Sequence, residues 1–247
     1  MKYISFSLWG DNKVYTYGMV ENILLAKDLY PGWIVRVHYN DTVPSNIIDW
    51  IRSQDNTELI HHQDNGKSAM NMFWRFEDLF LKDAVTIIRD SDSRLTEREV
   101  KIVNDWLKSD KDFYTSRDHE HHTVPIMGGS FGCRNNCLKW IPVKNNNNNI
   151  NGPRYVFMNG LDLMKQFVNQ NSNGQYCTDQ MFLGVFVYPN ICLNCKIYTS
   201  HNNYEPFCEM LDKVENGFIG EVVEECPMAS EIFGESEKQF KRVAQYD

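Results

Sequence analysis

The sequence lacks an apolar run long enough to cross a bilayer, because its longest nearly apolar stretch, residues 181–193, falls short of the roughly 20 residues that a membrane helix needs. No secretory signal is readable either, since residues 1–6 alternate like a strand and carry one cation. Positive charge is in deficit, with 25 Lys and Arg against 33 Asp and Glu. We therefore expect a cytoplasmic protein that has no membrane span and does not wrap nucleic acid.

A complete set of disulfides is also excluded, because seven cysteines is an odd number and no signal for secretion is seen. Two pairs, Cys133 with Cys137 and Cys192 with Cys195, are spaced so that four thiolates could hold structural zinc. A free cysteine at the end of an apolar strand packs as a small hydrophobe, which favours reduced thiols. The pattern leaves the zinc question open.

The order of predicted elements indicates the fold class. Strands are expected at residues 2–9, 33–39, 58–61 and 84–88, and helices at 18–30, 44–53, 68–81 and 96–108. Strand and helix thus alternate through the first 110 residues, which is typical of a mostly parallel sheet covered on both faces. Later strands are expected at 113–117, 126–133 and 195–199, and later helices at 160–168 and 178–186. We predict an α/β fold with a mixed central sheet flanked by helices.

One domain of 247 residues accounts for the length and the 42% hydrophobic content. We expect it to divide into a half at residues 1–110 that binds a ligand at its strand ends and a second half at 111–220. Five asparagines at 145–149 lie in a loop at 145–152, which has almost no apolar content and should be solvated. Residues 221–247 form a charged tail.

The sharpest local feature is Asp90-Ser91-Asp92, which follows the predicted buried strand at 84–88. Side chains at i and i+2 of extended backbone point the same way, so both carboxylates can face one point. Open α/β sheets bind ligands at the carboxyl ends of their strands. Two carboxylates there suit Mg²⁺ or Mn²⁺, which can hold a nucleotide diphosphate and offset its charge as it leaves. The same spacing at Asp110 and Asp112 follows an amphipathic helix among charges and is interpreted as a solvated turn.

Several single residues have both a functional and an ordinary interpretation. His201, after the predicted strand at 195–199, is either a loop histidine or a nitrogen ligand that would favour Mn²⁺. Asp179 and Gln180 either begin a helix, where an acid complements the dipole, or line a substrate. Arg75 is either a surface residue or a phosphate contact.

The segment between two predicted strands is rich in histidine and is followed by two glycines. Asp118 and His122 flank the cluster, whose spacing lacks the i, i+4 arrangement of helical metal ligands. We do not favour zinc there. Gly128 and Gly129 either allow a ligand to approach the backbone or mark a bulge.

Ordered segments over roughly the first 220 residues resemble nucleotide-sugar-dependent glycosyltransferases of the GT-A (Rossmann-like) fold, and more closely a little-characterised group found in microbes and large DNA viruses. The matching segments are residues 3–10, 30–33, 74–76, 89–94, 98–99, 106–107, 117–119, 122, 125–129, 179–180, 182–183 and 201.

The resemblance implies a role for each matching segment. It places the nucleotide at the first strand end, makes the two aspartates after the fourth strand the metal-binding DxD pair, and makes His201 a further metal or diphosphate ligand. The residues implied for the donor are Phe6, Ser7, Leu8, Trp9, Arg75, Arg89 and Asp90, and those implied for the metal are Asp90, Asp92 and His201.

The order of motifs resembles the retaining galactosyltransferase-type branch, in which Asp179 and Gln180 would lie beside the sugar, and we favour retention slightly. An inverting enzyme would need a carboxylate base, which Asp118 or Asp179 could supply. The sequence departs from the family's pattern at Glu120 and at Ser130-Phe131. These departures bear on the geometry of the acceptor side more than on the metal site.

The resemblance thus implies transfer of a sugar from a nucleotide diphosphate sugar to a hydroxyl of a glycan, glycoprotein or small molecule, with Mn²⁺ or Mg²⁺, in the host cytoplasm if the protein is viral. The alternatives are a HAD-type phosphohydrolase and a non-catalytic nucleotide-sugar-binding module. The sugar, base, acceptor and oligomeric state stay open, with a homodimer among the options.

Overall fold

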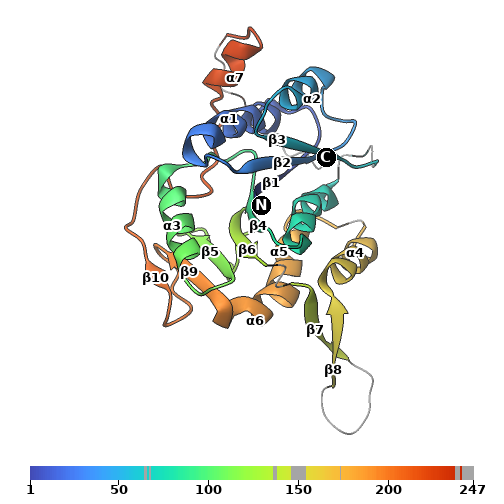
Figure 1. Ribbon diagram of the computed structural model, residues 1–247, viewed down its shortest axis with the longest axis vertical. Helices are drawn as coiled ribbons and strands as arrows, with labels where there is room; N and C mark the ends of the chain where they lie inside the picture. Colours follow the sequence, from blue (N-terminus) through green and yellow to red (C-terminus); the bar gives the residue numbers. More distant parts are fainter. Residues whose placement is uncertain are drawn as a thin grey trace.

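The computed structural model describes residues 1–63, 66, 68–135, 138–145, 154–172, 174–236 and 240. In these residues the chain forms an eight-stranded sheet in the order β10-β9-β5-β6-β4-β1-β2-β3 (Figure 1). Strand β6 runs antiparallel to both of its neighbours, β4 and β5, and the other pairs are parallel. The predicted α/β class with a mixed, mostly parallel sheet is confirmed. The strands are β1 (Lys2–Leu8), β2 (Ile34–Tyr39), β3 (Thr57–His61), β4 (Val85–Arg89), β5 (Phe113–Arg117), β6 (Ser130–Arg134), β9 (Cys195–Thr199) and β10 (Glu209–Met210).

Helices cover both faces of this sheet, and each face has its own hydrophobic core. The first core packs against α1 (Lys13–Leu29), α2 (Ser45–Arg52), α3 (Glu97–Lys108) and α7 (Pro227–Ile232). The second packs against the 3₁₀ helix η1 (Ala69–Phe80), α4 (Gly160–Gln170), α5 (Thr178–Phe182), the π-helix η2 (Leu183–Val187) and α6 (Tyr188–Ile191), which continues into η3 (Cys192–Asn194).

Alternate side chains of strand β1 point to opposite faces of the sheet. Ile4, Phe6 and Leu8 alternate with serines and lie in the first core. The serines face η1: the Ser5 hydroxyl donates to the Arg75 carbonyl at 3.0 Å, and the Ser7 hydroxyl accepts from the Arg75 backbone N–H at 3.0 Å. Two hydroxyls on a central strand therefore fix the helix that carries Arg75.

The connections around β1 create a crevice at the carboxyl ends of the strands. The chain leaves β1 through α1 toward β2 and β3, then returns through η1 to β4 on the other side of β1. It leaves β4 through α3 in the opposite direction, toward β5. Such a reversal of strand order is where open α/β sheets bind ligands.

Some predicted boundaries are wrong. Helix α1 begins at Lys13, ahead of the predicted residue 18, because the Asn12 side chain caps it by accepting from the Val14 N–H at 2.9 Å. The strand predicted at 126–133 is limited to β6, whose first residue is Ser130, and the residues before it follow an irregular path beside the site described below. A hairpin of β7 (Trp140–Asn145) and β8 (Arg154–Asn159), which projects at the bottom of Figure 1, was not predicted. Most of the predicted Asn-rich loop, residues 146–152, lies outside the described residues.

Part of the predicted tail packs on the domain. The Val223 N–H donates to the Asp92 carbonyl at 2.9 Å, and Val222 forms a bridge with Ser93. The Arg94 guanidinium donates to the carbonyls of Val223 and Glu225 at 3.0 and 2.9 Å. Residues 222–225 thus brace the turn after β4, whereas residues 237–239 and 241–247 lie outside the described part of the chain.

Close packing of α1 on the turn after β4 predicts the effect of enlarging Gly18. A Cβ at Gly18 would lie 2.2 Å from the Ser91 carbonyl oxygen, which is backbone and cannot step aside. We expect Gly18→Ala to lower the free energy of unfolding by about 1–3 kcal/mol, measured by urea denaturation. Gly184→Ala is the matched control, because a Cβ there meets no atom within 4 Å. Equal stability of the two variants would contradict this packing.

Candidate functional site

A cavity of about 390 Å³ opens at the crevice between β1 and β4. It is lined by residues that lie far apart in the sequence and come from the ends of both strands, from η1, from α5 and from the braced segment near residue 222. The predicted site residues among them are Ser7, Leu8, Trp9, Arg75, Asp90, Asp92, Asp179 and Gln180.

Asp90 and Asp92 both line this cavity, directly after the end of β4. The Asp90 side chain is 42% exposed, whereas Asp92 is buried, with 5% of its surface exposed. Two hydrogen bonds stabilise the turn that carries them: the Ser93 hydroxyl donates to the Asp90 carbonyl, and the Asn22 amide donates to the Ser93 carbonyl. The structure therefore brings the predicted carboxylate pair to one cavity wall.

Arg75 connects this pair to the second predicted motif. Its guanidinium, almost fully buried, forms an ion pair with Asp90 through Nη1 and lies 3.2 Å from Asp179 Oδ2 through Nη2. Asp90 follows a strand and Asp179 lies in α5, so one cation holds two separate elements together. Arg75 is a lining residue of the cavity and not a surface residue.

The carboxyl of Asp179 is buried, and this burial raises its pKa. Asp90 nearby raises it as well, while the Arg75 guanidinium lowers it. Burial outweighs the Arg75 ion pair, so the Asp179 carboxyl binds a proton more readily than an exposed aspartate does.

Gln180 positions the strip of chain that precedes β6. Its side-chain oxygen accepts from the Gly128 N–H at 2.7 Å, and its side-chain nitrogen donates to the Ile126 carbonyl at 2.9 Å. A Cβ at Gly129 would lie 1.8 Å from Asp90 Oδ2. The two glycines therefore allow the backbone to approach the Asp90 and Asp179 carboxylates closely.

Two residues predicted to contact the donor support the site from inside the protein. Arg89 is fully buried, donates to the Gly129 carbonyl and the Ser93 hydroxyl at 2.9 and 3.0 Å, and lies 3.3 Å from Glu99. Phe6 belongs to the first hydrophobic core. Neither residue is among those that line the described cavity.

Asp118, predicted as an alternative base, is held in an ion pair. Arg98 donates to both of its carboxylate oxygens at 2.6 and 2.7 Å, and the Ile219 N–H donates to one of them at 3.0 Å. Its own N–H donates to His122 Nδ1 at 3.0 Å. Asp118 is fully buried and does not line the described cavity, so its observed contacts position the segment around Ile219.

His201 lies after β9, three strands away from β4 in the sheet. Its Nδ1 is 2.9 Å from the Ser200 hydroxyl, and its ring centroid is 6.3 Å from that of His119. His201 therefore lies beside the histidine-rich segment. It is not one of the residues that line the described cavity.

Several lining residues carried no signal in the sequence. Tyr176 and Cys177 precede α5, Gly220 is the last residue of the predicted second half, and Val222 lies in the predicted tail. These segments have no periodicity and no motif, so the sequence does not predict that they lie at the cavity. Tertiary contacts place them there, such as the hydrogen bond between Val223 and Asp92. Tyr15, on the first turn of α1, was missed because the start of that helix was placed too late.

The predicted cysteine pairs are only partly described. Cys192 and Cys195 are free, and burial raises the pKa of the Cys195 thiol. Cys133 is buried in β6. Cys137 lies outside the described residues. As for membranes, no helix within the described ranges is both long and apolar enough to span one.

His122 provides a pH test of the support around Asp118. Burial, with nearby His119, lowers the pKa of His122 from 6.5 to about 4, which agrees with its Nδ1 accepting a hydrogen bond. The unfolded chain binds this proton near pH 6.5 and the folded chain only near pH 4, so stability is complete above 6.5 and falls as the pH drops. We expect His122→Gln to remove up to about 1.4 kcal/mol per pH unit of this slope in urea titrations between pH 4 and 7. An unchanged slope in His122→Gln would refute the assignment.

Comparison with known proteins does not assign a family. No family model matches the sequence, and no curated protein matches it. Among solved structures, 4-diphosphocytidyl-2C-methyl-D-erythritol synthase from Anaerococcus prevotii DSM 20548 aligns over 88% of this chain and 91% of its own, with 12% identity and a TM-score of 0.37. This likeness is too low to bear on function.

Proposed function

We propose that the protein is a metal-dependent glycosyltransferase that moves a sugar from a nucleotide diphosphate sugar to a hydroxyl acceptor. The observation that carries the proposal is that Asp90, Asp92 and Asp179 line one cavity at the reversal of strand order between β1 and β4. The resemblance of the sequence to GT-A glycosyltransferases supports the same interpretation. The acceptor would be a glycan, a glycoprotein or a small molecule.

The charge of the cavity fits a divalent cation. Three carboxylates line it against one guanidinium, so the wall is formally negative when all of them are ionised. A diphosphate would be repelled by such a wall unless a cation lay between the two. Asp90 and Asp92 would hold Mn²⁺ or Mg²⁺, which prefer carboxylate oxygens. The bound ion would stabilise the charge of the departing diphosphate.

The remaining residues would orient the substrates. Ser7, Leu8 and Trp9 form the wall contributed by β1, where the nucleotide is proposed to bind. Arg75 keeps the Asp90 and Asp179 carboxylates in place, so that neither needs to reorganise when substrate binds. Gln180 holds the chain before β6 and leaves the Gly128–Gly129 backbone open to a sugar.

Asp179 is the carboxylate proposed to lie beside the reacting carbon. With retention, which the resemblance favours, it would face the sugar while the diphosphate takes the acceptor proton. With inversion, it would serve as the base, since burial already raises its pKa. Asp118 is the weaker choice for that role, because Arg98 and the Ile219 N–H engage its oxygens.

The two alternatives predict different products. A HAD-type phosphohydrolase would release inorganic phosphate, and its motif is expected on the first strand, whereas Asp90 follows the fourth strand of this chain. A binding module would release nothing. A glycosyltransferase releases a free nucleoside diphosphate, and this is the readout that the tests use.

Exchange of one metal-site carboxylate provides the main test. We expect Asp92→Asn to reduce Mn²⁺-dependent release of nucleoside diphosphate from the donor by at least about 100-fold, because the ion supplies several kcal/mol of charge stabilisation. The donor is chosen beforehand by thermal shift with UDP-, GDP- and TDP-sugars, since a ligand of the native state raises the melting temperature. Asp110→Asn is the matched control, taken from the second Asp-x-Asp sequence of the chain.

Full activity of Asp92→Asn would refute the proposed metal site. Release of phosphate instead of diphosphate would favour the phosphohydrolase. Donor binding without any release, with every acceptor class tried, would favour the binding module.

The proposed ligand role of His201 has its own test. If His201 holds the metal or the diphosphate during turnover, His201→Ala should raise the Mn²⁺ concentration that gives half the maximal rate by about tenfold. Substitutions around a bound metal have effects of this size. The assay is the initial rate against Mn²⁺ concentration. An unchanged curve would leave His201 with only its observed contacts to Ser200 and the ring of His119.

A further inference from the structure

A second group of potential metal ligands lies apart from the carboxylate pair, at the carboxyl ends of β2 and β3. His38 of β2, His62 just after β3 and Glu77 of η1 each place one ligand atom within 4.8 Å of the other two. His38 Nδ1 and His62 Nε2 are 3.0 Å apart. Among the residues that the structure describes, no other group of three or more His, Cys, Asp or Glu side chains converges in this way.

The second ring nitrogen of His38 has the surroundings of a metal ligand. His38 Nε2 lies 3.1 Å from Asp78 Oδ2, and the same oxygen lies 3.4 Å from Arg36 Nε. These contacts are electrostatic, because neither His38 Nε2 nor Asp78 Oδ2 makes a hydrogen bond within the described residues. A carboxylate beside the second ring nitrogen is common for metal-binding histidines, and it favours a proton on Nε2. A proton on Nε2 leaves the lone pair of Nδ1 directed toward His62 and the centre of the group.

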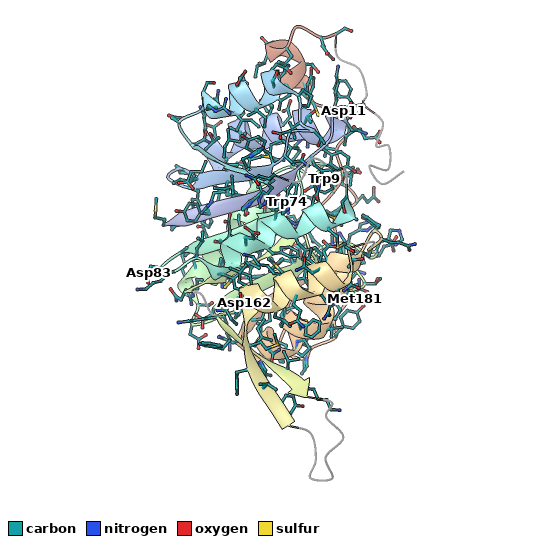
Figure 2. All side chains as sticks on the ribbon, turned by 90° about the vertical axis from the view of Figure 1, so that its right-hand side faces the viewer. Trp9, Asp11, Trp74, Asp83, Asp162 and Met181 are labelled. Carbon is teal, nitrogen blue, oxygen red and sulfur yellow. The ribbon has the colours of Figure 1, made fainter. Side chains whose placement is uncertain are left out.

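The ring of His62 is held by stacking. It lies parallel to Trp74, with 4.4 Å between centroids and 6° between planes. Trp74 in turn meets Trp9 edge to face, with 6.4 Å between the ring centroids. Both residues are labelled in Figure 2. Trp9 lines the cavity. The histidine is therefore oriented by a row of rings that ends at the wall of the functional site.

Glu77 carries a charge that its surroundings do not compensate closely. Within the described part of the chain, no hydrogen bond or ion pair to its carboxylate is found, although the side chain is half-buried. Its carboxylate and the two histidine nitrogens therefore converge on one point, where a cation would compensate the negative charge.

An ordinary explanation exists for part of this arrangement, since two neutral histidines can share a hydrogen bond. It accounts for the contact between His38 and His62 and leaves the converging Glu77 carboxylate without a role. A metal accounts for all three ligands and for the Asp78 contact behind them.

We propose that His38 Nδ1, His62 Nε2 and the Glu77 carboxylate bind a Zn²⁺ ion, with water in the remaining position. Two imidazoles and one carboxylate form a common ligand set of protein zinc. On binding, the proton of neutral His62 moves from Nε2 to Nδ1, so the histidines release no net proton. The ion would join the end of β2, the chain after β3 and η1 beside the Trp9 wall of the cavity. This proposal does not depend on the proposed glycosyltransferase activity.

Calorimetric titration of the full chain with Zn²⁺, after treatment with a chelator, tests the site. We expect one tight site in the wild type and at least about tenfold weaker binding in both His62→Gln and Glu77→Gln, because even outer-shell substitutions have effects of this size. His61→Gln is the matched control, since His61 is the preceding residue and pairs with Asp41 at 2.7 Å. His121→Gln controls for the histidine-rich segment. Both controls should bind Zn²⁺ as the wild type does.

X-ray absorption of the wild-type zinc complex keeps the test independent of how the variants fold. We expect nitrogen and oxygen ligands at about 2.0–2.2 Å and no sulfur shell at about 2.3 Å. Sulfur ligation, equal affinity in His62→Gln and wild type, loss of binding in His121→Gln, or no zinc binding by the wild type would each overturn the proposal.

Discussion

The buried guanidinium of Arg75 is the contact on which the functional site depends. It pairs with Asp90 at the end of β4 and with Asp179 at the start of α5, two segments that no regular hydrogen-bond ladder joins. Without it, the buried Asp179 carboxyl would lose the charge that lowers its pKa, while burial and the nearby Asp90 would still raise that pKa. The helix that carries Arg75 is itself fixed to β1 by the hydroxyls of Ser5 and Ser7. The central strand thus positions the charges of the site through a single side chain.

A second buried cation holds the same turn from the opposite side. Arg89 donates to the Gly129 carbonyl and the Ser93 hydroxyl, and its charge is balanced by Glu99 of α3 at 3.3 Å. The position of the carboxylate pair is therefore set by two arginines with different roles. Arg75 lines the cavity, whereas Arg89 stabilises the backbone beneath it.

The fold was largely predictable from the sequence because its signals are local. The β1 alternation of apolar residues with Ser5 and Ser7, and the capped helix at Thr96, identify elements without tertiary information. The Asp90–Asp92 pair was recognisable because it follows a buried strand, which also set it apart from the solvated copy at Asp110. What could not be predicted depends on partners distant in sequence: the ion pair between Arg98 and Asp118, the bracing of Asp92 by Val223, and the convergence of His38, His62 and Glu77.

The proposed function depends on Asp90 and Asp92 holding a divalent cation that binds a nucleotide diphosphate. Anomalous diffraction from crystals grown with Mn²⁺ and a nucleoside diphosphate measures this directly, because the signal locates the ion. We expect a manganese peak in contact with both carboxylates and with diphosphate oxygens. A peak at other side chains only, or a diphosphate bound in the cavity with no metal beside these two aspartates, would contradict it.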